Sequence, residues 1–126
     1  MANTPTPQKR TILLVDDRDQ SRVSTKWFLN NLGFEVESAH NAEEALVLFD
    51  AKIHDLVITD NSMPGMTGGE MAHIIKLRSP STLVLMYSDS PPGDSSCLDG
   101  VLRKPNHLLV LKEAVDKLFA AKAACC

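Results

Sequence analysis

The feature that most constrains the fold is an alternation of short apolar runs with longer stretches of helical pattern. Strand-length apolar runs occupy residues 11–15, 34–38, 55–59, 82–87 and 100–103. Several of them are continuously apolar, as strands buried on both faces should be. Strands that alternate with helices form parallel sheets covered by helices on both faces. The pattern predicts an α/β fold with a doubly wound, five-stranded parallel sheet in the order 2-1-3-4-5.

Helices are expected between most of these strands and after the last one. Their predicted ranges are from just after Asp17 to Leu32, from a cap at Asn41 through Phe49, Gly69–Arg78, and about His107–Ala123. Gly33 supplies a natural stop for the first helix. On that helix, helical spacing turns Thr25, Phe28, Leu29 and Leu32 toward the sheet.

The same spacing places Val23 and Trp27 together on the outward side of the first helix. Trp27 is the single tryptophan of the chain, and tryptophan is enriched at binding hot spots. We therefore predict that Val23 and Trp27 form a surface for a partner or for self-association. The alternative is that Trp27 lies flat against its own helix or packs on the N-terminal tail, since single exposed apolar residues are common.

Chemically active side chains follow the strands at their carboxyl ends, where ligands bind in doubly wound folds. They are Asp16 and Asp17 after the first strand, Asp60 after the third, Ser88 after the fourth and Lys104 after the fifth. Three neighbouring carboxylates repel one another and require a cation, and Mg2+ prefers such oxygen ligands. The ammonium and hydroxyl groups suit phosphoryl oxygens, and an aspartate can attack phosphorus. Taken singly, each of these residues also suits a helix cap or a turn. The prediction of a phosphoryl-binding site therefore depends on all of them lying at the same edge of the sheet.

Three segments carry a resemblance to a known family. Ile12–Asp17, Asp55–Gly68 with its Met63-Pro64-Gly65 turn, and Lys104-Pro105 resemble the receiver domains of bacterial response regulators, which have a flavodoxin-like fold. The resemblance implies that Asp60 is the phosphoacceptor. It implies that Asp17 binds Mg2+ directly, Asp16 acts through water, and the backbone carbonyl of Ser62 is a further metal ligand. It also implies that Ser88 is the switch hydroxyl and Lys104 the phosphate-binding lysine.

The sequence departs from the family pattern in three places. Asp89 stands where a very small residue usually follows the switch hydroxyl, and we expect its carboxylate to repel and crowd an incoming phosphoryl group. Val101 stands where an aromatic switch residue is usual. The connection from Asp89 to Asp99 contains Pro91, Pro92 and Gly93 and is too short for a helix of about 10–14 residues with its loops. We therefore expect the fourth helix of the family to be shortened or missing, and 90–98 to form a loop.

Composition and length narrow the remaining possibilities. The 126 residues fit one domain, and we assign 1–10 to a flexible N-terminal tail, 11–123 to the receiver domain and 124–126 to a C-terminal tail. The net charge of -3 and scattered basic residues argue against direct nucleic-acid or membrane binding, and no apolar run approaches the roughly 18 residues of a membrane span. A cytoplasmic location is expected. Cys97, Cys125 and Cys126 are interpreted as ordinary reduced thiols.

The function predicted from these observations is that of a phosphoacceptor in a two-component or phosphorelay system. A phosphohistidine of a sensor kinase or histidine phosphotransfer protein would donate to Asp60 with Mg2+, and the domain would signal through a partner protein without being an enzyme. One alternative is a degenerate receiver that binds partners without phosphorylation. Another is an aspartate-nucleophile phosphatase, since Asp17-x-Asp19 follows a strand. That reading leaves Met63-Pro64-Gly65 unexplained.

Overall fold

The computed structural model confirms the predicted sheet. It describes residues 10–104 and 107–124, so most of the predicted N-terminal tail, Pro105, Cys125 and Cys126 lie outside the described residues. The strands are β1 (Thr11–Val15), β2 (Glu35–Ala39), β3 (Leu56–Thr59), β4 (Leu83–Ser88) and β5 (Gly100–Arg103). All neighbouring pairs are parallel, in the order β2-β1-β3-β4-β5. Predicted strand ends differ from these by at most one residue.

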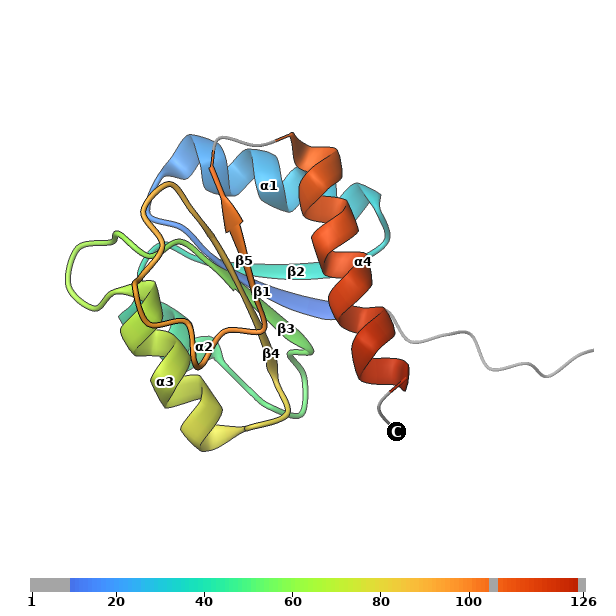
Figure 1. Cartoon of the computed structure of the whole chain (residues 1–126). Helices are drawn as coiled ribbons and strands as arrows, with labels where there is room; N and C mark the ends of the chain where they lie inside the picture. The colour runs from blue at the N-terminus through green and yellow to red at the C-terminus, as the bar shows by residue number, and fades with distance from the viewer. Residues whose placement is uncertain (1–9, 105–106, 125–126) are drawn as a thin grey trace, which may run out of the picture.

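Four helices cover the two faces of the sheet in the described part of the chain. They are α1 (Asp19–Asn31), α2 (Ala42–Leu48), α3 (Gly68–Arg78) and α4 (Leu108–Ala124). Helices α1 and α4 lie on one face, and α2 and α3 lie on the other (Figure 1). Each face has its own apolar core, as expected when strands are buried on both sides. The last helix extends one residue beyond its predicted end, into the segment assigned to the C-terminal tail.

Local signals explain where the helices begin and end. Gly33 follows α1 with φ +102°, a left-handed conformation that glycine adopts without strain. The side chain of Asn41 accepts a hydrogen bond from the Glu44 backbone N–H at 2.7 Å, which caps α2 as predicted. Helix α3 begins with a capping box between Thr67 and Glu70. The Thr-x-x-Glu pattern of these two residues is the sequence signal for this start, which lies one residue before the predicted one.

Helix α1 presents the two faces that its sequence predicts. Thr25 and Leu29 are buried, and Phe28 and Leu32 pack against the same core. On the other side, Val23 is 63% and Trp27 67% exposed. The prediction that the pair points outward is therefore confirmed, whereas its role in association stays a prediction.

The connection between β4 and β5 contains no helix. Residues 89–99 are described throughout and form turns and bends, including a turn in which the Leu98 N–H donates to the Ser95 carbonyl. Cys97 and Leu98 pack against the core beneath α2 and α3. Val84 and Lys76 both donate to the Asp99 carboxylate, at 2.8 and 2.6 Å, which fixes the end of the connection. The expected loss of an ordinary helix in this connection is thus observed.

In the part of the chain that the structure describes, no helix has both the length and the apolar character needed to cross a membrane.

Candidate functional site

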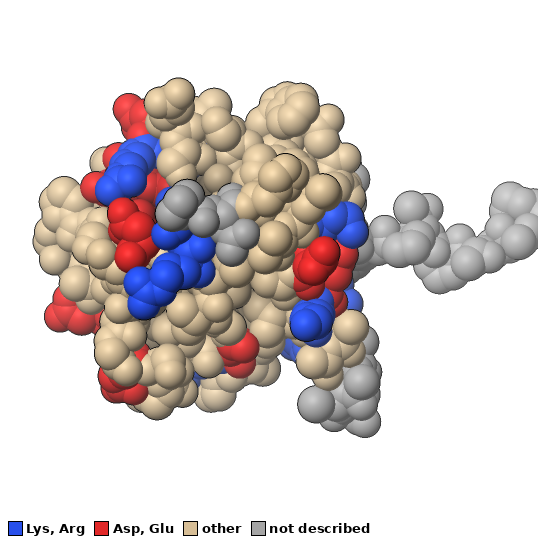
Figure 2. Space-filling model, turned by 45° about the horizontal axis from the view of Figure 1, so that its top comes forward, with Lys and Arg blue, Asp and Glu red and all other residues tan. Residues whose placement is uncertain are grey.

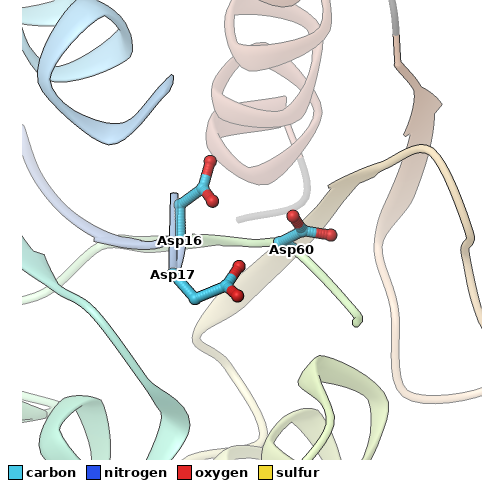
Figure 3. Close-up of side chains that lie close together, drawn as sticks. All are labelled: Asp16, Asp17 and Asp60. Carbon is cyan, nitrogen blue, oxygen red and sulfur yellow. The ribbon is translucent and has the colours of Figure 1, made fainter. Parts of the chain in front are cut away.

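The sheet places three carboxylates at its carboxyl edge. The Asp16 N–H donates to the Ala39 carbonyl of β2, and the Asp60 N–H donates to the Val15 carbonyl of β1, so both backbones continue the sheet. Carboxylate oxygens of Asp16, Asp17 and Asp60 all lie within 4.8 Å of one another. Figure 3 shows these side chains gathered around one space, with the carboxylate of Asp17 directed toward Asp60. Asp16 and Asp60 are buried, which strengthens the repulsion between their charges.

Lys104 reaches this cluster from the end of β5. Its backbone N–H donates to the Ser88 carbonyl at 2.9 Å, which anchors it beside β4. Its Nζ lies 2.9 Å from Asp16 Oδ2 and 3.8 Å from Asp60 Oδ2. One ammonium thus offsets part of the charge of two buried carboxylates and is already positioned beside Asp60.

Two further residues hold the ammonium, and the sequence analysis did not identify either. Ser21 on α1 accepts from Lys104 Nζ at 3.2 Å, and the ring of Tyr87 lies beneath Nζ, 5.0 Å from nitrogen to ring centre. Burial raises the pKa of Tyr87, and the nearby Asp16 carboxylate adds to the rise against the opposing Lys104 charge. Tyr87 is therefore a neutral phenol at physiological pH and offers Lys104 an aromatic face.

Asp17 provides the test of whether a cation fits. Its Oδ1 is buried and has no hydrogen-bond partner among the described residues. A buried carboxylate oxygen without a partner is strongly destabilising, whereas coordination to a hard cation satisfies it. Asp16 differs, because its two oxygens accept from the Arg18 N–H and from Lys104. The residues present fit Mg2+, with Asp17 offering the free ligand atom.

The loop after β3 is braced by the side chain of Asn61, which sequence reasoning also missed. Its amide nitrogen donates to the Ser90 carbonyl at 2.9 Å, and its amide oxygen accepts from the Gly69 N–H at 3.0 Å. This residue therefore links the loop after Asp60 to the start of α3 and to the loop after β4. Ser62 is exposed two residues after Asp60. Its carbonyl as a metal ligand stays a prediction.

Glycine at position 68 is required by the close approach of α3 to Asp60. A Cβ atom at Gly68 would lie 2.0 Å from the Asp60 carbonyl oxygen and 2.9 Å from its carbonyl carbon. Both contacts are to backbone, which cannot rotate away as a side chain can. The helix start and the strand end that carries Asp60 are therefore packed directly on one another.

Ser88 is the last residue of β4, and Asp89 follows it. Ser88 is fully buried, and its Oγ accepts from the Ser90 N–H at 3.1 Å. The carboxylate of Asp89 is paired with Arg18 at 3.5 Å, a partner that the sequence analysis did not foresee. Both side chains are largely exposed, so the pair contributes little to stability. Acidic and basic groups lie next to each other on the face that Figure 2 turns toward the viewer.

Fold and site together define a class. They describe a doubly wound α/β domain with an acidic cluster and a partly buried lysine at the carboxyl edge of its sheet. The chain belongs to the response regulator receiver domain family, whose model matches residues 12–116. It is therefore a receiver domain of two-component signalling.

Solved structures of receiver domains share this fold. The response regulator TrrA of Thermotoga maritima, in complex with Mg2+ and BeF, is 34% identical with a TM-score of 0.81, and the match covers 86% of this chain and 98% of that chain. A CheY-like receiver domain of Methanospirillum hungatei is 25% identical with a TM-score of 0.87 and coverages of 93% and 98%. The expected flavodoxin-like receiver fold is confirmed.

Curated relatives include much longer proteins. The autoinducer 1 sensor kinase/phosphatase LuxN of Vibrio campbellii is 32% identical over an alignment of 126 positions, and the alignment covers 94% of this chain and 15% of that protein. The sensor protein EvgS of Escherichia coli is 32% identical over an alignment of 118 positions, and the alignment covers 89% of this chain and 10% of that protein. The chain thus spans less than a sixth of the length of either relative.

Proposed function

We propose that this domain accepts a phosphoryl group on Asp60 with the help of Mg2+. The observation that carries the proposal is the buried Asp17 Oδ1, which has no hydrogen-bond partner among the described residues. A carboxylate oxygen of Asp17 also lies within 4.8 Å of oxygens of Asp16 and Asp60. Such a site has an excess of negative charge that a divalent cation would neutralise. Asp17 and Asp60 would hold the ion, Asp16 would act through water, and the Ser62 carbonyl would complete the protein ligands. Bound Mg2+ would supply charge neutralisation for the attacking carboxylate and the phosphoryl oxygens.

In the proposed reaction, an Asp60 oxygen forms a bond to phosphorus as the bond from phosphorus to a donor histidine nitrogen breaks. The bonding electron pair returns to that nitrogen. Lys104, already 3.8 Å from Asp60 Oδ2, would move from Asp16 to a phosphoryl oxygen. Ser88 would exchange its hydrogen bond from the Ser90 N–H for a contact with the phosphoryl group. These residues bind and orient the group, so the domain assists the reaction without being an enzyme.

The proposed donor is a sensor histidine kinase or a histidine phosphotransfer protein. TrrA, 34% identical to this chain, has been crystallised in complex with the histidine kinase ThkA. For this chain we propose a phosphohistidine donor of the same chemical kind, a cytoplasmic setting and an as yet unidentified downstream protein. Val23 and Trp27 form the proposed association surface.

The test is phosphorylation with acetyl phosphate and Mg2+, read as intact mass. The native chain should gain one phosphoryl group, and both Asp60→Asn and removal of Mg2+ by a chelator should abolish the gain. Asp55→Asn is the control, because Asp55 precedes β3 at the opposite end of that strand and accepts from the Thr11 N–H. An adduct that persists in Asp60→Asn would refute the assignment of the phosphoacceptor.

A second function is favoured by Asp89 and by the missing helix between β4 and β5. A degenerate receiver would bind its partner without phosphorylation. It predicts no mass gain in the native chain together with partner binding that Asp60→Asn leaves unchanged. The phosphatase alternative predicts repeated turnover of a small phosphomonoester, which the same assay detects as released phosphate.

A further inference from the structure

A second group of reactive side chains lies away from the acidic cluster, beside α3. The sulfur of Cys97 lies 3.2 Å from His73 Nδ1, and the other ring nitrogen of His73 lies 3.6 Å from Asp94 Oδ2. His73 belongs to α3, while Cys97 and Asp94 belong to the 89–99 connection that replaces a helix. Figure 1 shows this connection passing beside α3. The sequence alone indicated an ordinary thiol here, because nothing in it brings His73 to Cys97.

The arrangement is a thiol, an imidazole and a carboxylate in line. Cys97 and Asp94 contact opposite nitrogens of the imidazole, so the three groups do not converge on one point where a metal ion could bind. With Nδ1 accepting from the thiol, Nε2 carries the ring proton and faces Asp94. A base beside a thiol, oriented by a third group, is the arrangement that activates a nucleophile. Cys97 is a free cysteine of intermediate exposure.

The loop itself holds the carboxylate in place. Asp94 Oδ1 accepts from the Ser96 backbone N–H at 3.0 Å, which leaves Oδ2 facing His73. Hydrogen bonds from the Ser96 backbone and side chain lower the pKa of Asp94, with a smaller contribution from His73. Asp94 is therefore ionised at neutral pH, and its negative charge faces Nε2 of His73.

We propose that Cys97 is a reactive thiol that forms mixed disulfides with low-molecular-weight disulfides, with His73 as its base and Asp94 as the residue that orients His73. This activity does not depend on phosphorylation of Asp60. In the reaction the thiol proton passes to His73 Nδ1, and the sulfur attacks one sulfur of the disulfide. A new S–S bond forms as the old one breaks, and the departing thiolate takes the proton from the imidazolium. Cys97 is oxidised to a mixed disulfide, and one half of the reagent is reduced to a free thiol.

The experiment uses the full chain with Cys125→Ser and Cys126→Ser, so that Cys97 is its one thiol. The probe is dithiodipyridine, a neutral disulfide whose released thiopyridone is followed by absorbance. Peptide mass mapping confirms that the adduct is on Cys97. His73→Gln should slow the reaction at least about tenfold, since it removes the base. Asp94→Asn should slow it to a smaller extent.

His40→Gln is the matched control. His40 is also paired with a carboxylate, Glu44 at 3.1 Å, whereas the one cysteine among the described residues, Cys97, lies beside His73. Its substitution should leave the rate unchanged. In denaturant, the parent and His73→Gln should react at one common rate, slower than that of the folded parent.

Equal rates for folded parent and folded His73→Gln would overturn the proposal. So would a folded parent that reacts no faster than the unfolded chain, because Cys97 would then be a packing residue only. If His73→Gln proves unfolded by circular dichroism, Asp94→Asn decides, since its side chain is 64% exposed and its loss leaves the core intact. An unchanged rate in that variant would also refute the role of the imidazole–carboxylate pair.

Discussion

Replacing Gly68 with alanine should damage both the stability of the domain and its phosphorylation. The added Cβ would lie 2.0 Å from the Asp60 carbonyl oxygen, whereas ordinary van der Waals contact begins at 3.4 Å. The two backbones must therefore separate by roughly 1.4 Å, the difference between these distances. Gly68 does not have a positive φ, so the effect is steric and does not reflect backbone strain.

The magnitude follows from two opposing effects. Forcing extra volume into a packed site costs about 1–3 kcal/mol. Alanine gains about 0.5–1 kcal/mol over glycine inside a helix, and less at a helix start such as position 68. We expect a net loss of about 1–2 kcal/mol in the free energy of unfolding. If the separation moves Asp60, phosphorylation should slow by roughly tenfold to a hundredfold.

Gly69→Ala is the matched control on the same helical turn. A Cβ there meets side-chain atoms of Pro92 at 3.3 Å and of Asn61 at 3.4 Å, which need little adjustment. Urea unfolding gives the stability of both variants, and intact mass after acetyl phosphate treatment gives their phosphorylation rates. Gly68→Ala should be less stable than Gly69→Ala by at least about 1 kcal/mol. Equal stabilities and equal rates would refute the claim that α3 packs directly on the Asp60 backbone.

Three further predictions concern the site and the helix beside it. Asp17→Ala should weaken Mg2+ binding at least about tenfold by calorimetry, since it removes a direct charged ligand, whereas the exposed Asp19→Ala should not. Asp89→Ala should speed phosphorylation by acetyl phosphate, because a carboxylate beside the site is removed, and a slower rate would mean that its pairing with Arg18 helps. Hydrogen bonds from Thr67 lower the pKa of Glu70 below its usual 4.5. Glu70 therefore stabilises the fold above that pH and loses this effect as the pH falls through its lowered pKa, so the stability difference from Glu70→Gln should shrink in acid.

The sequence was sufficient for the sheet and for the residues at its carboxyl edge. Continuous apolar runs mark strands such as β3, and parallel topology then brings Asp16, Asp17, Asp60 and Lys104 to one edge. These inferences need only the period of a strand and the direction of its neighbours. They do not depend on the rotamer of any side chain.

The side-chain contacts around that edge could not be predicted in the same way. Ser21 meets Lys104 across 83 positions of sequence, and Arg18 meets Asp89 across 71. Whether such pairs form depends on rotamers and on loop paths that no local pattern encodes. The expectation that the Asp89 carboxylate repels a phosphoryl group therefore did not include its pairing with Arg18. The contact of Cys97 with His73 was missed because it requires the path of the 89–99 connection, which lacks any periodic signal.

We propose that a signal leaves the site through the 89–99 connection. Near the site, two hydrogen bonds hold this connection. The Ser90 N–H donates to Ser88 Oγ, and the Ser90 carbonyl accepts from the side-chain amide of Asn61. At its far end the Asp99 N–H donates to the Val84 carbonyl at 2.8 Å. If the Ser88 hydroxyl turns to a phosphoryl group on Asp60, the Ser90 N–H loses its acceptor. Because no helix follows β4 directly, the loss of this hydrogen bond acts on the loop beside α3. We therefore expect amide exchange at Ser90 to accelerate on phosphorylation of the native chain and to stay constant in Ser88→Ala, where that acceptor is already absent. Unchanged exchange at Ser90 in the phosphorylated native chain would show that Ser88 does not transmit the signal through this loop.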